Sequence, residues 1–214
     1  MSPPMANIPP ATVARLPLYL RSLASLPSDR PTCSSEELAQ IAGVQSAQVR
    51  KDLSLVGLRG VRGVGYDIDG LRLQLTSLLG LDHEVRVVIV GAGNLGRALA
   101  DFAGFREWGF TIVGLVDNDP AKIGTTVAGV PVNALSDLNR VVGDGEVSIG
   151  IIATPPGAAQ DVAERLADTG IRSILNFAPT VLRVDGIEVR RVDLSSELQI
   201  LAHHLYGPSA IEEL

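Results

Sequence analysis

The sequence predicts an α/β protein in which an N-terminal winged helix-turn-helix domain precedes a Rossmann domain built on a doubly wound parallel sheet. Three observations predict it. In residues 85–102 a strand-like apolar run passes directly into a Gly-x-Gly-x-x-Gly turn and a helix-forming segment. After residue 84, strand and helix signals alternate, as in parallel sheets covered on both faces. Before residue 80, short amphipathic helices precede a glycine-rich basic hairpin.

Composition narrows the class of protein. The 214 residues suffice for one large domain or two small ones with a sizeable core. Apolar runs stay well short of the roughly 20 residues that a membrane span needs, and the proline-rich start is not a signal peptide, so a cytoplasmic location is expected. The single cysteine, Cys33, excludes an internal disulfide framework, and the histidines have no metal-ligand spacing with it, so no metal site is expected.

Charge is distributed unevenly along the chain. Residues 11–66 contain seven Lys or Arg residues and four acids, a balance of +3, which leaves −9 for the rest of a chain with a net charge of −6. A basic end on an acidic body suggests a nucleic-acid-binding module joined to a part that binds something else. Solvated charged faces are the ordinary alternative.

The chain is expected to begin with a disordered tail of about eight residues. Apolar residues, Val13 among them, then recur at helical spacing from Thr12 to Leu26, and Pro17 is expected to start a new segment or to kink this helix. Residues 27–31 are expected to form a loop.

Two shorter helices follow. Ser34 and Glu37 have the spacing of a capping box, so a helix should begin there and end at Gly43. Ser46 can cap the next helix, which should end near Gly57. Two helices joined by a glycine turn make a helix-turn-helix, whose second helix enters the major groove of DNA; any small three-helix bundle is the alternative.

The hairpin at residues 59–66 is interpreted as a wing. Its glycines let the backbone lie close to DNA, and Arg59 or Arg62 can reach phosphate or a narrow minor groove. Tyr66 is expected to pack at the base of the wing rather than to stack on a base. The residues predicted to contact DNA are Ser46, Gln48, Arg50, Lys51, Arg59, Arg62, Gly63, Gly65 and Tyr66.

A connecting helix ends the first domain. Asp67 or Asp69 can cap it, its leucines lie on one side, and Gly80 ends it. The first domain therefore covers residues 1–80, and residues 80–84 form the boundary.

The glycine turn carries the strongest ligand signal. Gly91 permits the tight turn, Gly93 lets the backbone approach a pyrophosphate, and Gly96 lets the helix pack closely on its strand. A chance glycine turn is the alternative, but a second strand at 110–116 ends at Asp117, where an acid should hydrogen-bond an adenosine ribose. An acid there favours NAD(H) over NADP(H), because its carboxylate repels a 2′-phosphate.

Further strands and helices complete the second domain, residues 85–192. The expected elements are an edge strand at 130–132, a helix at 135–142, a central strand at 147–153, a helix at 158–169 and strands at 172–177 and 187–192. The loops 154–157 and 176–179 then lie at the carboxyl edge of the sheet, where a nicotinamide would be held. Asp119 can share or replace the ribose role of Asp117. The predicted cofactor contacts are Gly91, Ala92, Gly93, Asn94, Leu95, Gly96, Asp117, Asp119, Thr154, Pro155, Asn176, Phe177 and Ala178.

Residues 193–214 are expected to form a dimerisation helix and tail. Asp193 can cap a helix from Leu194 to Tyr206. Its apolar positions form one stripe, at Leu194, Leu198, Leu201 and Leu205. Few residues remain to cover this stripe, which points toward a partner subunit; docking on its own sheet is the alternative.

Two functions compete on these observations. An NAD-dependent oxidoreductase needs a proton donor near the nicotinamide, such as a His, a metal or a Tyr activated by Lys. The chain has two lysines, Lys51 and Lys122, three tyrosines and no Tyr-x-x-x-Lys pair, and no segment remains for a substrate domain. A sensor that takes the dinucleotide as its signal and DNA as its output needs no catalytic residue.

Over nearly its whole length the sequence resembles the Rex family of bacterial redox-sensing transcriptional repressors. The motifs that carry the resemblance are Arg15-Leu-Pro-Leu-Tyr19, Val49-Arg-Lys-Asp-Leu-Ser54, Gly60-Val-Arg-Gly-Val-Gly-Tyr66, Val90-Gly-Ala-Gly-Asn-Leu-Gly96, Gly129-Val-Pro-Val132 and Gly170-Ile-Arg-Ser-Ile-Leu-Asn-Phe-Ala-Pro179. The resemblance implies a homodimer that exchanges its last helices. It also implies that the free or NAD⁺-bound form holds operator DNA and that NADH releases it.

One position departs from the family pattern. Members of the family often have an aromatic residue after the aspartate that opens the final helix, whereas Asp193 is followed here by Leu194. The departure concerns the nicotinamide contacts and not the fold. The resemblance also implies a reversible pairing of Asp193 with Arg21 of the first helix.

Overall fold

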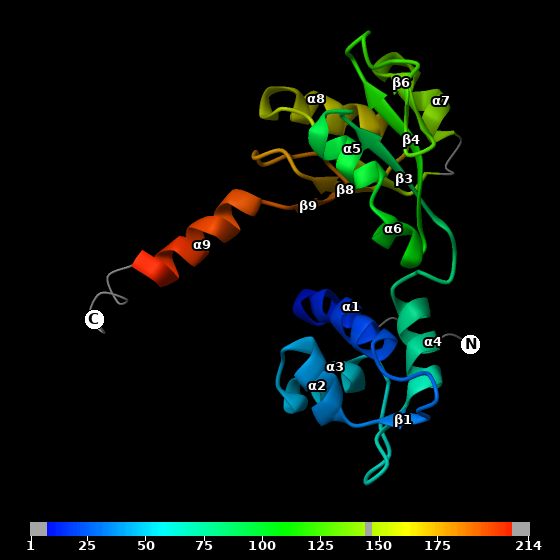
Figure 1. Ribbon diagram of the computed structural model, residues 1–214, viewed down its shortest axis with the longest axis vertical. Helices are drawn as coiled ribbons and strands as arrows, with labels where there is room; N and C mark the ends of the chain where they lie inside the picture. Colours follow the sequence, from blue (N-terminus) through cyan, green and yellow to red (C-terminus); the bar gives the residue numbers. More distant parts are fainter. Residues whose placement is uncertain (1–7, 144–146, 207–214) are drawn as a thin grey trace. The chain divides into compact units, whose positions relative to one another are not determined.

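The computed structural model describes residues 8–143 and 147–206, and the chain divides into two compact units, Met1–His83 and Glu84–Leu214 (Figure 1). Most of the predicted N-terminal tail and the segment after Tyr206 lie outside the described residues. The elements of the first unit are α1 (Pro10–Ala24), β1 (Thr32–Cys33), α2 (Ser35–Ala42), α3 (Ser46–Leu55), β2 (Tyr66–Asp67) and α4 (Ile68–Leu78).

The helix α1 buries one face within the first unit. Leu16, Tyr19 and Leu23 are at most 1% exposed, because residues three and four positions apart share a helix face. The helix runs through Pro17 as one element, so the expected new segment does not start there. Burial of the apolar side chains on both sides of Pro17 offsets the loss of the backbone hydrogen bond that proline cannot donate. Val13, expected on the apolar face, is 42% exposed.

The helix-turn-helix consists of α2 and α3. The predicted capping box is confirmed, since the Ser34 hydroxyl accepts the Glu37 N–H at 3.1 Å and the Glu37 carboxylate accepts the Ser34 N–H at 2.9 Å. Gly43 ends α2 in the left-handed conformation, with φ 68°. The predicted Ser46 cap is wrong. Gln45 is the N-cap residue and makes no side-chain cap, because the chain enters the helix one residue earlier than Ser46 capping requires.

A two-residue ribbon that the sequence did not reveal holds the base of the wing. Strands β1 and β2 pair antiparallel, with Cys33 opposite Tyr66. Gly65 has a φ of 100°, and a Cβ there would overlap the carbonyl oxygen of Cys33, so the close approach requires glycine. The following helix α4 is capped by Asp67, whose carboxylate accepts the Gly70 N–H at 2.7 Å.

The second unit is built on a seven-stranded sheet with the order β5-β6-β4-β3-β7-β8-β9, parallel except where β5 pairs with β6. Its elements are β3 (Val85–Val90), α5 (Asn94–Ala100), α6 (Ala103–Glu107), β4 (Phe110–Asp117), β5 (Thr126–Val127), β6 (Val130–Ala134), η1 (Leu135–Asp137), α7 (Leu138–Val142), β7 (Ile149–Ile152), α8 (Pro156–Asp168), β8 (Ser173–Asn176), β9 (Glu188–Arg191) and α9 (Leu194–Tyr206). The strand order reverses at β3, so the crevice between β3 and β7 is the switch point at which doubly wound sheets bind ligands.

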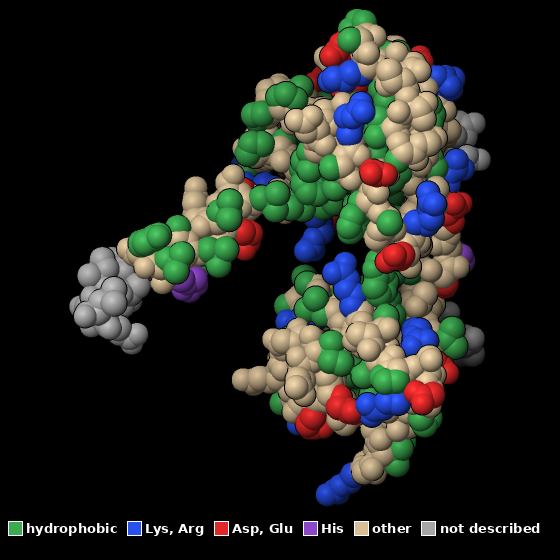
Figure 2. All heavy atoms as spheres, in the orientation of Figure 1, with side chains coloured by type: hydrophobic (Ala, Val, Ile, Leu, Met, Phe, Trp, Pro, Cys, Tyr) green, Lys and Arg blue, Asp and Glu red, His purple; other side chains and the backbone are tan. Residues whose placement is uncertain are grey.

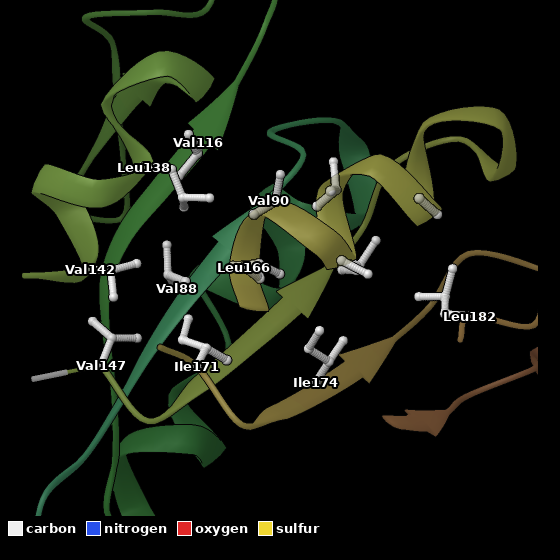
Figure 3. Packing of buried hydrophobic residues seen from close by; sticks show 14 of the residues in the cluster. Val88, Val90, Val116, Leu138, Val142, Val147, Leu166, Ile171, Ile174 and Leu182 are labelled. Atoms are coloured by element: carbon white, nitrogen blue, oxygen red, sulfur yellow. The ribbon is translucent and has the colours of Figure 1, made fainter. Parts of the chain in front are cut away.

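Successive side chains of each strand point to opposite faces of the sheet, so the hydrophobic core is divided between the two faces. One face packs against α7 and α8, as the side chains of Val88, Val116, Leu138 and Leu166 show in Figure 3. On the other face Ile89 and Leu115 pack with side chains of α5 and α6. The residues predicted as an edge strand, 130–132, belong to β6, which lies between β4 and the unpredicted β5.

The last helix, α9, buries none of its described residues. Asp193 caps it as predicted, accepting the Ser196 N–H at 3.1 Å and the Ser196 hydroxyl at 2.8 Å. Leu198 and Leu201 are 67% and 58% exposed, and hydrophobic side chains line the helix in Figure 2. Docking of α9 on its own sheet is therefore not what the structure shows. No described helix is both long and apolar enough to cross a membrane.

Candidate functional site

Each glycine of the turn after β3 meets a different steric requirement. Gly91 has a φ of 106°, and a Cβ there would lie 2.5 Å from the carbonyl oxygen of Ala153. A Cβ on Gly96 would overlap the carbonyl oxygen of Gly91, so this glycine allows α5 to pack against the turn. Around Gly93, by contrast, the space is open. An open backbone at this point is what a pyrophosphate needs.

The turn opens into a cleft of about 670 Å³ at the carboxyl ends of β3, β4 and β7. It brings together eight of the predicted cofactor residues, Gly91, Gly93, Asn94, Leu95, Asp117, Asp119, Thr154 and Pro155. The amino end of α5 faces this cleft, and no side chain in the described structure caps it. Its backbone N–H groups and positive dipole end are suited to an anionic group.

Asp117, at the end of β4, is hydrogen-bonded to the glycine turn. Its side chain is 7% exposed. One carboxylate oxygen accepts the Ala92 N–H at 2.7 Å, and the other accepts the Asp119 N–H at 2.9 Å. Burial by itself would raise the pKa of Asp117, but these hydrogen bonds and that of Lys122 outweigh it and lower the pKa.

Lys122 belongs to the cleft although the sequence reasoning did not place it there. Its Nζ donates to Asp117 Oδ2 at 3.1 Å and lies 3.6 Å from Asp119 Oδ2. The hydrogen bond to Asp117 raises the pKa of Lys122. The spacing of five residues after a strand-end acid was its only sequence signal. Asp119 is 42% exposed, so its carboxylate is the more accessible of the two.

Thr154 places its hydroxyl group in the cleft. Its hydroxyl oxygen is buried and makes no hydrogen bond within the described part of the chain. Buried hydroxyls are normally paired, because an unpaired one costs free energy. A ligand with a polar group at this point would satisfy it, so the residues present fit a dinucleotide.

The second predicted nicotinamide loop does not line this cleft. Asn176 is fully buried, and its amide nitrogen donates to the carbonyl oxygens of Ala178 and Thr180 at 3.2 and 2.9 Å. Its amide oxygen accepts the Ala178 N–H at 2.9 Å. Phe177 packs against the core on the face of the sheet that α5 and α6 cover. In this structure Asn176 shapes its own loop.

In the first unit, polar side chains of α1 and α3 converge on one buried carboxylate. Asp52 is fully buried and accepts from Arg15 Nε at 2.6 Å and Nη2 at 2.8 Å. It also accepts from the Tyr19 hydroxyl at 2.7 Å, the Gln48 amide at 2.9 Å and the Thr12 hydroxyl at 3.0 Å. We call these five residues the Asp52 node. Burial opposes ionisation, but the hydrogen bonds, led by that of Arg15, hold the pKa of Asp52 well below its ordinary value.

The cations predicted to contact DNA differ in their partners. Arg50 Nη1 donates to the Glu36 carboxylate at 2.9 Å and to the Ser35 hydroxyl at 2.8 Å, so α2 holds it. Among the residues described, none pairs with Lys51, Arg59 or Arg62, and all three are exposed.

The wing is an exposed turn on a buried base. Val61 and Gly65 form the bridge that closes it, and Gly63 turns at a φ of 80° with open space around it. Tyr66 is 8% exposed, as expected for a residue at the base of the wing. Ser46, in the first turn of α3, is partly exposed.

Two family models match the chain, one in the N-terminal part and one in the C-terminal part. The chain matches the family models described as "Putative DNA-binding protein N-terminus" over residues 7–54 and "CoA binding domain" over residues 82–180. It is 59% identical over 201 residues to the redox-sensing transcriptional repressor Rex of Streptomyces griseus. The aligned residues cover 92% of this chain and 79% of that protein.

Two crystal structures of RSP, a Rex-family repressor, are similar over most of the chain. The complex with β-NAD⁺ and operator DNA has a TM-score of 0.87 at 35% identity, covering 95% of this chain and 94% of that one. The complex with β-NADH has a TM-score of 0.81 at 34% identity, covering 95% and 96%.

Proposed function

The chain belongs to the Rex family of redox-sensing transcriptional repressors, and we propose that it represses transcription according to the cellular NADH/NAD⁺ ratio. It binds operator DNA when NADH is low, and binding of NADH releases it. The observation that carries this function is the presence, in one chain, of a glycine-turn cleft that fits a dinucleotide and of a helix-turn-helix with a wing. Lys51 of α3 and Arg59 and Arg62 of the wing have no partner among the described residues.

The cleft holds NADH or NAD⁺ rather than their 2′-phosphorylated forms. Asp117 and Asp119 stand where the adenosine ribose is expected, and their carboxylates repel a 2′-phosphate. Lys122 does not reverse this preference, because both acids already flank its ammonium group. Asp119, the more exposed acid, shares the ribose with Asp117 or takes it over.

A second candidate, an NAD-dependent oxidoreductase, has less support. The described residues that line the cleft include no His, Tyr or Cys to donate a proton to a substrate. Lys122 is held by carboxylates. The relatives are named transcriptional repressors. We therefore propose that the chain is not an enzyme, and that it acts in the cytoplasm, where operator DNA and the dinucleotides meet.

DNA is bound by the first turns of α3 and by the wing. Lys51, Arg59 and Arg62 contact phosphates or the minor groove. Ser46, Gln48 and Arg50 lie on α3, where base edges and nearby phosphates are reached. Gly63 and Gly65 keep the wing backbone close to DNA, and Tyr66 supports the wing from below.

The active form is a homodimer that exchanges α9. The helix exposes an apolar stripe, and a sheet face within the same unit offers an apolar hollow of about 280 Å³. Val87, Ile151 and Leu175 are among the residues that line this hollow. A helix from a second copy would remove both apolar surfaces from water. Leu194 then stands near the partner's cleft, in the place of the family's aromatic residue.

The Asp193–Arg21 pairing remains part of this proposal. In the structure Asp193 caps α9 and lies 3.6 Å from Arg191. Its hydrogen bonds with Ser196 lower its pKa, so it is ionised at neutral pH and can pair with an arginine.

The test is a complete binding cycle at one salt concentration. Operator affinity is measured with and without NADH, and NADH affinity with and without operator. The two ratios must be equal, since a ligand that weakens a second ligand is weakened by it to the same extent. Equal NADH affinity in the presence and absence of operator would contradict the sensor function. NAD⁺ and NADPH are the matched comparison ligands.

A further inference from the structure

Lys122 is the one cation among the described residues that line the dinucleotide cleft. Its ammonium nitrogen is close to both acids that face the adenosine ribose in the proposed function, 3.1 Å from Asp117 Oδ2 and 3.6 Å from Asp119 Oδ2. The side chain of Lys122 is 35% exposed, so a ligand in the cleft can reach it. The ammonium group is therefore placed to contact the same ribose as the two carboxylates.

The backbone around Lys122 is held without its side chain. The Lys122 N–H donates to the Asp119 carbonyl oxygen at 3.0 Å, and the Lys122 carbonyl oxygen accepts the Thr125 hydroxyl at 2.6 Å. The Asp119 carboxylate closes the same turn by accepting the Ala121 N–H at 3.0 Å. These contacts fix the point from which the side chain extends, and a substitution of the side chain leaves them in place.

The ammonium group has a donor that the protein does not use. A lysine ammonium carries three N–H donors and no acceptor. Within the described residues, that of Lys122 makes one hydrogen bond, to Asp117, and one ion pair, to Asp119. At least one N–H is therefore available to a ligand in the cleft.

The hydroxyl groups of a ribose need such a donor. Each hydroxyl donates one hydrogen and offers two lone pairs, whereas an ionised carboxylate only accepts. Two carboxylates alone would bind the hydroxyl hydrogens and leave the hydroxyl oxygens without a donor once the ligand has displaced water, which costs free energy. An ammonium group beside the same carboxylates supplies the missing donor.

We propose that Lys122 binds the adenosine ribose directly, donating from Nζ to one hydroxyl oxygen while the neighbouring carboxylates accept from the hydroxyls. The two hydroxyls then meet a donor and acceptors at one place. This inference rests on the proposed function, because it requires the cleft to bind a dinucleotide. The alternative role of Lys122 is to hold the two acids without contacting the ligand.

The experiment pairs a change in Lys122 with a change in the ribose. Calorimetry measures the affinity of the full-length protein for NADH and for two analogues whose adenosine ribose lacks the 2′- or the 3′-hydroxyl. Lys122→Met keeps the length of the side chain and removes its donors and charge, and Lys122→Arg restores both. Arg140→Met is the matched control, because Arg140 also pairs with an acid three positions away, Asp137, and does not line the cleft. Urea unfolding verifies that each variant is folded.

The expected loss depends on the ribose hydroxyl. Lys122→Met should weaken NADH binding about 10-fold, the lower end of the range for hydrogen bonds to charged groups, whereas Lys122→Arg should weaken it less than about 3-fold and Arg140→Met less than about 2-fold. For one of the two analogues, Lys122→Met should cost less than about 2-fold, because that analogue lacks the oxygen to which Nζ donates.

A second background separates direct contact from an effect through the neighbouring acid. In Asp119→Asn the amide oxygen can still accept the Ala121 N–H, and the charge is gone. Lys122→Met should again cost about 10-fold in this background, since Nζ donates to the ribose itself. Asp117 does not depend on Lys122 for its position, because the N–H groups of Ala92 and Asp119 hold it.

Three results would overturn the inference. The first is an unchanged NADH affinity in Lys122→Met. The second is a loss of the same size for NADH and for both analogues, which indicates general attraction to an anionic ligand. The third is a loss that disappears in Asp119→Asn, which indicates that Lys122 acts by holding that acid. If NADH still releases the wild-type protein from its operator, these results remove the inference about Lys122 and leave the proposed function intact.

Discussion

Each unit has a buried carboxylate at its functional surface, and the two are held by different kinds of donor. Within the described residues, Asp52 accepts from side chains alone, three of them on α1. Asp117 accepts from the backbone N–H groups of Ala92 and Asp119, together with Lys122. Side-chain donors depend on residue identity, whereas backbone donors depend on the path of the chain.

This difference has a consequence for how the two sites tolerate change. The Asp52 node joins two helices that are far apart in the sequence, so it fixes the position of α3 and depends on the identity of the side chains that donate to Asp52. The Asp117 contacts shape a turn whose glycines have already determined its path. We therefore expect substitutions at Asp52 to affect folding first, and substitutions at Asp117 to affect ligand binding first.

The largest expected effect is that of Asp52→Ala. It leaves the buried Tyr19 hydroxyl and the partly buried Arg15 guanidinium without their acceptor. Removal of one partner from a buried ion pair costs about 3–5 kcal/mol, and the partial exposure of Arg15 places the expected loss near the lower value. Urea unfolding measures the loss, and NADH affinity should stay unchanged because the cleft lies in the other unit. Asp29→Ala, at an exposed acid, is the control and should change stability by less than about 0.5 kcal/mol. A loss below about 0.5 kcal/mol for Asp52→Ala would contradict the structural role of this carboxylate.

Acid should remove the contribution of the same carboxylate. The folded-state pKa of Asp52 is depressed, so its contribution is fully present above the unfolded pKa, about 3.9, and is lost as the pH falls below it. The stability difference between wild type and Asp52→Asn should therefore be constant from pH 7 to about pH 5 and narrow below about pH 4. Urea unfolding at each pH measures it, and a constant difference down to pH 3 would show that Asp52 is not held ionised.

For the second carboxylate the expected loss appears in ligand binding. Asp117→Ala removes a carboxylate that accepts from the glycine turn, and we propose that it also accepts from the ribose. NADH binding should weaken by about 1–3 kcal/mol, the value of hydrogen bonds to a charged group. Calorimetry measures this, with Asp119→Ala in parallel. Equal NADH affinity in Asp117→Ala and a loss in Asp119→Ala would assign the ribose to Asp119.

The smallest expected effects distinguish two neighbouring cations of α3. Lys51→Ala should lower the slope of log affinity against log salt by about one, because one phosphate contact disappears for every sequence. Arg50→Ala should lower it by less, because Glu36 already pairs with Arg50 in the free protein. Titrations at several salt concentrations compare the two. An unchanged slope in Lys51→Ala would remove Lys51 from the DNA contacts.

Local chemistry explains which parts of the site were predictable from sequence. The capping box at Ser34 and Glu37 and the turn at Gly91 involve residues a few positions apart, so their spacing predicts their contacts. Asp117 was found because it ends a strand at a known distance from that turn. Its second role, as an acceptor for the Ala92 N–H, was not predicted, since no spacing rule describes it.

Long-range contacts explain what was missed. Asp52 looked like one of four acids in a basic segment, and its partners on α1 lie 33 to 40 positions away. The pairing of Cys33 with Tyr66 is only two residues long, which is too short for an alternation pattern. Pro17 predicted a new segment or a kink because local propensity favours one. The new segment does not appear, because tertiary packing of α1 continues the helix through Pro17.

The shape of the wing makes occupancy of the DNA-binding surface visible without any label. Arg59 and Arg62 stand on an exposed turn, and exposed loop tips are the sites that proteases cut first. Trypsin cleaves after arginine, so the free protein should be nicked within the wing before its helices are attacked. A wing pressed into a DNA groove is shielded from the enzyme. Protection by operator, and its reversal on addition of NADH, would therefore appear as bands on a gel of the unmodified protein.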